Sequence, residues 1–499
     1  MVRKAFIRLL IPFLLFYALP VSAAEKEEHP WQEEIVYYIV VDRFNNGNPH
    51  NDGKDRNPQD PAAYHGGDLE GVIKKLDYLK EMGFTAIALS SVMASEDYTG
   101  NLVENHKQVE EHFGSMADLQ RLVEEAHKRE MKVILEFVAN HVGPNHPWIE
   151  EKQQWFHQKV DLTDVQDQEN RLNGWVNGLP DLATENEETR DFLIETAAWW
   201  LEETNADGFY INHPDTIETE FWQLFQSEIK KVNNNAYLIG SLLDSSNESK
   251  YLESGFDSIL NERFFQEASD MFAKVDLPFA AMTDVVENSS PALITYLDSD
   301  NDVRFTRKSV ENNQHPGIRL KMALSYMYTI PGTPFVYYGT EIALNGGEPP
   351  ENRPLMNFQS DEELIDYIGK LAKIRNSLPA LTKGDYHVLY EKDGMIIFTR
   401  TLEDETVIVA INNTSASQKV VIPEADIAEN KELQGLLTGD TFEEENGEYE
   451  FILDREIAEI YEVNEKKGLN LPFISVFIFV PVLFIVFLVL AKKRGKRKE

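Results

Sequence analysis

The chain has 499 residues, of which 42% are hydrophobic and 26% charged, so it is long enough for about three domains of ~150 residues and too apolar to be wholly disordered. It contains no cysteine, which excludes disulfide bonds, thiolate metal sites and a cysteine nucleophile. The formal net charge is −38, which argues against a nucleic-acid partner because phosphate binding requires clustered lysine and arginine.

Residues 1–24 predict a signal peptide. A basic start at Arg3, Lys4 and Arg8 precedes an apolar stretch over residues 9–19, and small residues follow at 21–24. This order is typical of an export signal. The alternative is an N-terminal membrane anchor, for which the apolar stretch is short.

Residues 471–491 predict a transmembrane helix. They contain no charged side chain and have the length that a helix needs to cross the hydrocarbon core of a bilayer. A basic tail, residues 492–499, follows and should remain in the cytoplasm by the positive-inside rule. We therefore expect a single-pass protein of the cell membrane, with an extracellular ectodomain joined to the membrane helix by residues 464–470.

Between these ends, short apolar runs alternate with helical patterns, which predicts a parallel sheet. Eight such units fit a (β/α)₈ barrel, also called a TIM barrel, over residues 25–381. The eight expected strands are Ile35–Val41, Thr85–Leu89, Lys132–Val138, Gly208–Ile211, Tyr237–Gly240, Phe256–Leu260, Ala292–Leu297 and Pro334–Tyr338.

Two regions depart from the alternation. Residues 142–185 are polar, contain three tryptophans and lack a clear period, so we expect a small lobe inserted after the third strand. After Leu381 only short strand-like runs remain, which predicts a C-terminal antiparallel β-sandwich over residues 382–463. The expected strands are Val388–Tyr390, Met395–Thr401, Thr406–Ile411, Lys419–Ile422 and Tyr449–Leu453.

Four blocks of this sequence resemble the α-amylase family, glycoside hydrolase family 13. They are Tyr64–Asp68 (YHGGD), Phe113–Ser115 (FGS), Lys132–Val142 (KVILEFVANHV) and Ile330–Leu344 (IPGTPFVYYGTEIAL). The similarity extends over about residues 33–465. The resemblance implies a barrel, a small inserted lobe and a C-terminal sandwich, as the alternation does.

The resemblance also implies where three catalytic carboxylates would stand, and this sequence has other residues there. The nucleophile position carries Asn212, the acid/base position Ser241 and the position of the third carboxylate Asn301. Retaining hydrolysis of a glycosidic bond needs two carboxyl groups, one to attack and one to protonate the leaving oxygen. An amide is a weak nucleophile and a serine hydroxyl is a poor proton donor near neutral pH. We therefore expect the family's reaction to be lost.

Other positions of the implied pocket are partly retained. Tyr98 and His141 match the family pattern, whereas Tyr210 stands in place of an arginine and Asp300 in place of a histidine. We predict these four residues as the substrate-binding set. The lobe tryptophans could add aromatic faces for a sugar ring, although ordinary packing explains such residues equally well.

The loop near the start of the barrel resembles the calcium loop of cyclodextrin glycosyltransferases and neopullulanase-like enzymes. Hard oxygen ligands of this kind and number suit Ca²⁺. The alternative is a polar turn rich in asparagine and glycine that holds no metal. The predicted ligands are the side chains of Asn46, Asn48, Asn51, Asp52 and Asp68 with the carbonyl of Gly66.

The sequence alone leaves three hypotheses. The first is a membrane-anchored, catalytically inactive module that binds α-glucan or maltooligosaccharide, or serves as a scaffold for a neighbouring membrane protein. The second is an active α-glucan hydrolase or transglycosylase that uses displaced carboxylates, with Asp215 and Asp300 as candidates. The third is an interaction domain that binds no carbohydrate.

Overall fold

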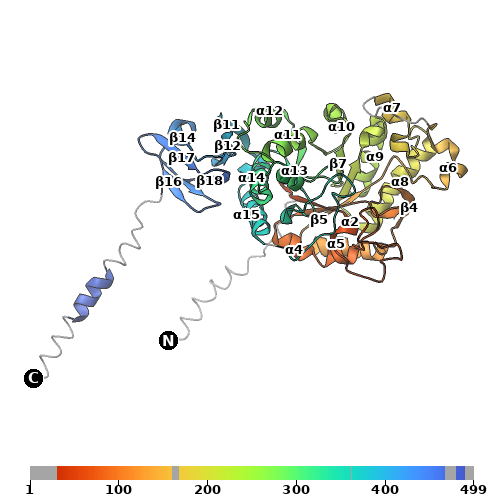
Figure 1. Cartoon of the computed structure of the whole chain (residues 1–499), viewed down its shortest axis with the longest axis horizontal. Coiled ribbons are helices and arrows are strands. Elements are labelled where there is room, and N and C mark those ends of the chain that lie inside the picture. Colours follow the sequence, from red (N-terminus) through yellow and green to blue (C-terminus); the bar gives the residue numbers. More distant parts are fainter. Residues whose placement is uncertain (1–30, 160–167, 361, 467–478, 489–499) are drawn as a thin grey trace, which may run out of the picture.

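Eight parallel strands close into a barrel in the computed structural model, which describes residues 31–159, 168–360, 362–466 and 479–488 (Figure 1). All eight predicted barrel strands are confirmed, with ends that shift by a few residues. The strands are β1 (Val36–Ile39), β2 (Ala86–Leu89), β5 (Lys132–Glu136), β6 (Gly208–Asn212), β7 (Tyr237–Ser241), β8 (Ser258–Leu260), β9 (Leu293–Tyr296) and β10 (Thr333–Tyr337).

The strands are short and almost continuously apolar because both of their faces are covered. Every residue of β1 and β2 is buried, as expected for parallel strands with side chains filling the barrel on one face and helices on the other. The helices of the barrel are α2 (Val41–Phe44), α3 (Leu69–Ile73), α4 (Leu76–Glu81), α5 (Met116–Lys128), α8 (Glu187–Thr204), α9 (Thr219–Val232), α10 (Glu248–Glu253), α11 (Glu262–Phe272), α12 (Ala280–Asn288), α13 (Phe305–Glu311), α14 (Pro316–Thr329), α15 (Glu363–Ser377) and α16 (Ala380–Lys383).

Helix α5 shows how local sequence positions an element. Ser115 and Asp118 form a reciprocal capping box at its N-terminus. Leu119, Leu122 and Val123 then lie on one buried face, as their spacing predicts.

One pair of strands was not predicted. Strands β3 (Met93–Ser95) and β4 (Val103–Val109) form a separate antiparallel sheet between β2 and α5. The burial along β4 does not alternate with a period of two, because irregular pairing shifts its register against β3. The polar sequence VENHKQV therefore lacks the usual pattern of a strand.

Between β5 and β6 the described chain forms short helices before α8, in the region where we expected a lobe. These are α6 (Trp148–Glu151), α7 (Gln168–Asn173) and the 3₁₀ turns at Gln153–Trp155 and Val176–Gly178.

The C-terminal domain is antiparallel, as predicted. A six-stranded sheet packs against a two-stranded sheet around a shared apolar core that includes Ile397, Ile408 and Phe451. Strands β15, β16 and β18 were missed, and β18 continues to Glu465 into the expected linker. The domain contains β11 (Asp385–Lys392), β12 (Met395–Leu402), β13 (Glu405–Asn412), β14 (Gln418–Pro423), β15 (Lys431–Gly435), β16 (Thr441–Glu443), β17 (Glu448–Leu453) and β18 (Ile457–Glu465).

A buried arginine joins the C-terminal domain to the barrel. Arg400 on β12 is 1% exposed and donates hydrogen bonds to the carbonyl oxygens of Thr329 (2.7 Å), Leu381 (2.8 Å) and Gly384 (2.9 Å). Burial, and then the neighbouring charge of Arg375, lower the pKa of Arg400 to about 9. The guanidinium therefore remains charged at neutral pH while it links α14, α16 and the residue after α16 to the sheet.

The predicted terminal segments fall mostly outside the described residues. The expected signal peptide (1–24) and basic tail (492–499) lie outside the described residues. Of the expected membrane span, the structure describes only residues 479–488, which form a helix. In the part of the chain that the structure describes, no helix combines the length and apolar character that crossing a membrane requires.

We expect Arg400→Ala to lower the free energy of unfolding by about 2–4 kcal/mol, because several buried carbonyl oxygens lose their donor. Urea denaturation would measure the change. Arg455→Ala is the matched control, because Arg455 is exposed in the same domain and should change stability by less than about 0.5 kcal/mol. Equal effects of the two substitutions would contradict the role of Arg400.

Candidate functional site

The mouth of the barrel brings together tyrosine and acidic side chains from the carboxyl ends of several strands. We call Tyr38, Glu136, Tyr210, Asp300 and Tyr337 the barrel-mouth cluster. The Tyr38 hydroxyl donates to Glu136 Oε2 at 2.9 Å. The Tyr38 ring lies 5.6 Å from the Tyr210 ring and 5.8 Å from the Tyr337 ring, measured between centroids. Side chains distant in sequence thus meet where barrel enzymes place their active sites.

Burial controls the protonation of this cluster. Glu136 is 2% exposed, and burial together with the negative charge of Asp300 raises its pKa to about 8. Burial and the same two acidic groups raise the pKa of Tyr210. Burial in the cluster therefore favours the protonated form of the Glu136 carboxyl group.

Arg353 holds Asp300 in the cluster. Its guanidinium lies 3.9 Å from the Asp300 carboxylate and donates to the Asp300 backbone carbonyl at 2.7 Å. Arg353 also donates to the Tyr98 hydroxyl at 3.2 Å. The loop after β10 thereby connects the predicted residues Tyr98 and Asp300.

Three buried polar atoms at the mouth have no hydrogen-bond partner among the described residues. They are Glu136 Oε1, the Tyr337 hydroxyl and Asn212 Oδ1. Buried polar groups in native proteins are nearly always paired with protein, water or ligand. All three atoms can therefore accept hydrogen bonds from hydroxyl groups that enter the mouth. The Tyr337 hydroxyl can also donate one.

The positions implied for catalysis lie partly together. Asn212 and Ser241 are the last residues of adjacent strands and are paired in register. Asn301 is exposed, and its backbone N–H donates to Ser299 Oγ at 3.1 Å. The structure thus brings two of the three positions together and leaves the third on the surface.

The predicted substrate-binding residues divide in the same way. Tyr210 and Asp300 belong to the barrel-mouth cluster. Tyr98 is only 3% exposed, and one face of its ring is covered by the guanidinium of Arg43 at 3.7 Å. Burial, followed by the charge of His213, lowers the pKa of His141 to about 4, so its ring is neutral at physiological pH.

Asp215, the displaced carboxylate considered first, is already engaged. It is 1% exposed and accepts hydrogen bonds from the backbone N–H groups of Leu243 and Asp244, both at 3.0 Å. The Arg171 guanidinium lies 3.6 Å from it. Asp215 therefore connects loops, and the suggestion that it could act on a substrate is not supported.

The lobe tryptophans are buried or half-buried, and each contacts neighbouring residues. Trp148 and Trp155 contact each other at 4.9 Å between centroids, and the Lys152 ammonium lies 3.4 Å over the Trp155 ring. Trp175 donates to the His157 carbonyl at 3.1 Å. Packing explains these residues.

The predicted calcium ligands are divided between two environments. Asn46 Nδ2 donates to Asp52 Oδ1 at 2.7 Å, and both side chains lie against Gly66. Asp68 faces elsewhere, because its carboxylate accepts backbone N–H groups from Gly47, Asn48 and Gly71.

Two atoms of this loop nevertheless suit a hard cation. Asn46 Oδ1 and Asn51 Oδ1 are buried and lack hydrogen-bond partners in the described structure. Amide and carboxylate oxygens are the ligands that Ca²⁺ prefers. Asn46, Asn51, Asp52 and the Gly66 carbonyl fit the ion better than Asp68 does.

Sequence reasoning missed Tyr38, Tyr337 and Arg353 as site residues. Tyr38 and Tyr337 could have been found, because each lies near the carboxyl end of a strand that the sequence predicts. Arg353 lies in an irregular loop with no motif, so only the folded structure places it at the mouth.

Comparisons with known proteins agree with this architecture. The model of the alpha amylase catalytic domain matches residues 38–367, and that of the alpha-amylase C-terminal domain matches residues 384–461. A beta/alpha-amylase of Paenibacillus polymyxa is 30% identical over 446 residues, which are 84% of this chain and 36% of the relative, so the chain spans about a third of that protein. A maltogenic alpha-amylase of Bacillus acidopullulyticus is 29% identical, over 81% of this chain and 73% of the relative.

Two solved structures are more similar in sequence. An α-amylase of Anoxybacillus is 48% identical with a TM-score of 0.86, covering 89% of this chain and 100% of that one. An α-amylase of Geobacillus thermoleovorans, solved with acarbose, is 44% identical with a TM-score of 0.84, covering 88% of this chain and 100% of that one. With its catalytic-domain match extending over most of its length, the chain belongs to the α-amylase family, glycoside hydrolase family 13.

Proposed function

We propose that this protein binds α-glucan chains at the barrel mouth. The unpartnered buried atoms of Glu136, Tyr337 and Asn212 carry this proposal, because a hydroxyl-rich ligand supplies the partners that they lack. The names of the relatives support the ligand class, since they are amylases and one was solved with acarbose.

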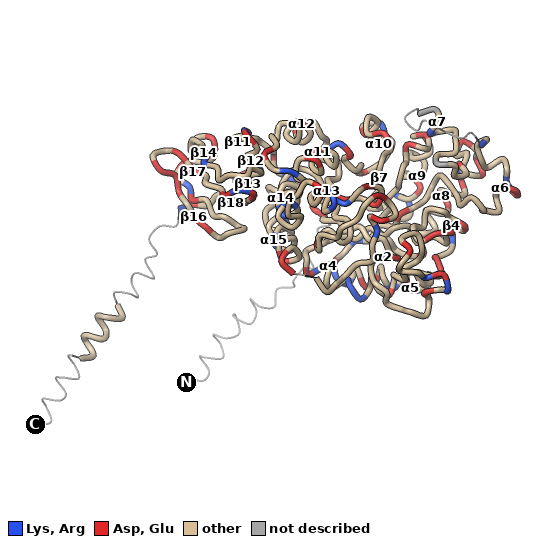
Figure 2. The backbone as a smooth tube through the Cα atoms, viewed as in Figure 1, with Lys and Arg blue, Asp and Glu red and all other residues tan. Residues whose placement is uncertain are grey.

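The charge of the molecule suits a neutral ligand. The net charge is −38, and Figure 2 shows acidic positions scattered through both the barrel and the C-terminal domain, with basic positions between them. A negative field of this kind opposes anionic ligands and leaves the binding of neutral saccharides unaffected.

Cleavage at Asn212 and Ser241 is not part of this proposal. The two strand ends present an amide and a hydroxyl, and neither group replaces the carboxyl pair that retaining hydrolysis requires. The protein would therefore bind α-glucan without performing the family's usual reaction.

A second candidate function is hydrolysis of α-glucan by Glu136 and Asp300, and the amylolytic names of the relatives favour it. A specific observation also favours it, because burial and the charge of Asp300 raise the pKa of Glu136 to about 8, and Arg353 lies 3.9 Å from Asp300 Oδ2. Protonated Glu136 would give its proton to the leaving glycosidic oxygen as the C–O bond breaks. Asp300 would take a proton from the attacking water.

We also propose that Ca²⁺ binds the loop that contains Asn46, Asn51, Asp52 and Gly66. The buried oxygens of the two asparagines support this assignment, because neither has a hydrogen-bond partner in the part of the chain that the structure describes. The ion would connect the loop to the Gly66 turn and so stabilise the rim of the barrel.

Tyr337→Phe should weaken binding of maltoheptaose about 5–10-fold, since it removes one hydrogen-bonding group worth about 1–1.5 kcal/mol. Stability should not fall, because the lost hydroxyl has no partner in the described structure. Calorimetry and thermal melts measure both. Tyr328→Phe is the control, because Tyr328 is equally buried and its hydroxyl also has no partner among the described residues, but it lies on α14. Unchanged affinity in Tyr337→Phe, or no binding by the unmodified chain, would refute the proposal.

The hydrolytic candidate predicts that the purified chain releases reducing ends from maltoheptaose. Glu136→Gln and Asp300→Asn should each reduce the rate at least 100-fold, because one removes the proton donor and the other the base. The rate should also fall as pH rises through about 8, where Glu136 loses its proton. Sugar that stays intact, or equal rates in the variants, would eliminate this candidate and leave binding alone.

Millimolar Ca²⁺ should raise the melting temperature by about 2–4 °C over an EDTA-treated sample, as expected when a ligand binds only the folded state. Asn46→Ala should abolish the shift. Asn57→Ala, an exposed asparagine of the same loop region, should preserve it. A shift that persists in Asn46→Ala would place the ion elsewhere.

A further inference from the structure

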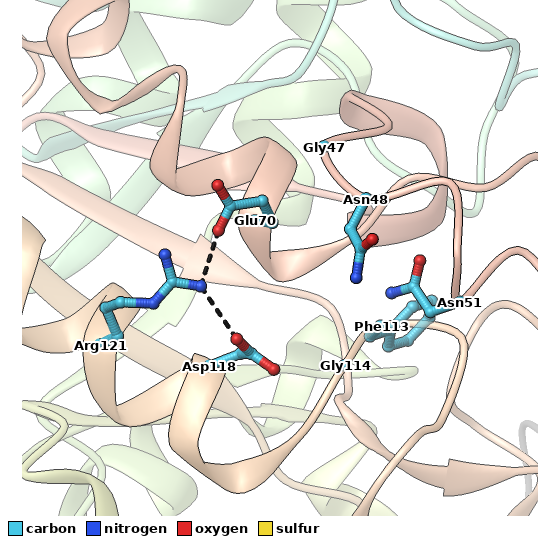
Figure 3. Close-up of a pocket in the computed structure, with 8 residues that line it drawn as sticks. All are labelled: Gly47, Asn48, Asn51, Glu70, Phe113, Gly114, Asp118 and Arg121. Carbon is cyan, nitrogen blue, oxygen red and sulfur yellow. Dashed lines mark hydrogen bonds and ion pairs between the residues drawn. The ribbon is translucent and has the colours of Figure 1, made fainter.

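A small cavity lies on the rim of the barrel, formed by residues outside the barrel-mouth cluster. Its volume is about 220 Å³, and it lies between the loop before α3, helix α3 and the start of α5 (Figure 3). We call it the rim pocket; its principal lining residues are Asn48, Asn51, Glu70, Phe113, Asp118 and Arg121.

One wall of the rim pocket consists of hydrogen-bond acceptors held in place by an arginine. Arg121 lies 2.6 Å from Glu70 Oε2 and 2.9 Å from Asp118 Oδ1. Asp118 is fixed further because Ser115 donates to its carboxylate through both its N–H (3.0 Å) and its hydroxyl (2.6 Å). The acceptors are therefore preorganised, and Arg121 offsets part of their negative charge.

The opposite wall consists of hydrogen-bond donors. Figure 3 shows the amide nitrogens of Asn48 and Asn51 turned towards the space in front of Asp118, while their amide oxygens point away from it. Asn48 Oδ1 accepts the backbone N–H of His50 at 3.3 Å, which favours this orientation of the amide.

We propose that the rim pocket binds a single neutral sugar ring. A ligand there must donate to carboxylates on one side and accept from amide groups on the other, and each sugar hydroxyl can do both. An anion would face Glu70 and Asp118, and a monovalent cation would compete with Arg121 for the same oxygens. The cavity is smaller than the ~300–1,000 Å³ of pockets that enclose drug-sized ligands, so one ring fits and a longer chain does not.

This inference goes beyond the proposed function, because it adds a second saccharide site that shares no residue with the mouth. Binding should be weak, in the millimolar range. Phe113 is 1% exposed, so it closes the floor of the pocket without offering a face on which the ring can stack.

Ligand-detected NMR with methyl α-glucoside as the probe tests the rim pocket in the full-length chain. We expect Glu70→Ala and Asn51→Ala each to weaken binding at least fivefold, because each removes hydrogen bonds from one wall. Glu124→Ala is the matched control. Glu124 is also a glutamate that pairs with a cation, since it lies 2.9 Å from Lys128, but it is on the exposed face of α5. This substitution should leave binding unchanged. Thermal melts establish that the variants are folded.

The outcomes separate the two sites. Binding of methyl α-glucoside that is unaffected by both rim variants would overturn the inference, and so would binding that Tyr337→Phe abolishes. Loss of maltoheptaose binding in Tyr337→Phe with the glucoside retained supports both sites. If neither sugar depends on Tyr337 but the glucoside depends on Glu70, the rim pocket stands and the proposed function fails.

Discussion

Closure of eight parallel strands into a barrel is the constraint on which the rest of the structure depends. In a closed parallel barrel every strand ends at the same rim, so side chains far apart in sequence meet there. Tyr38 on β1, Glu136 on β5 and Tyr337 on β10 converge for this reason alone. The same geometry pairs Asn212 with Ser241 at the ends of neighbouring strands.

Burial then determines the chemistry of what has been brought together. The raised pKa of Glu136 comes first from its removal from water and second from the charge of Asp300. At the other end of the barrel wall, burial lowers the pKa of Arg400, yet this arginine keeps its charge because carbonyl oxygens surround it. The two buried groups thus serve different purposes. Glu136 favours its protonated form at the mouth, and Arg400 attaches the C-terminal domain to the barrel.

The rim of the barrel contains two further polar environments beside the mouth. Near Asn46 and Asp52, the buried amide oxygens of Asn46 and Asn51 suit a cation, whereas Asn48 and Asn51 present nitrogens to the rim pocket. A single loop after β1 therefore contributes to both environments, because an amide side chain has an acceptor on one side and donors on the other.

The sequence by itself determined the architecture and the identity of the residues at the strand ends. Apolar runs, helical spacing and the capping residues of α5 are local, and local physics is sufficient to predict them. The β3–β4 pair was missed because its register is irregular, and strand β18 was missed because it is stabilised by pairing with β13 and β15, which lie earlier in the chain. Only the tertiary structure decided that Asp215 is held by Arg171, that backbone N–H groups occupy the Asp68 carboxylate and that Arg353 reaches the mouth. Those outcomes depend on contacts between segments whose separation in sequence gives no indication of their proximity.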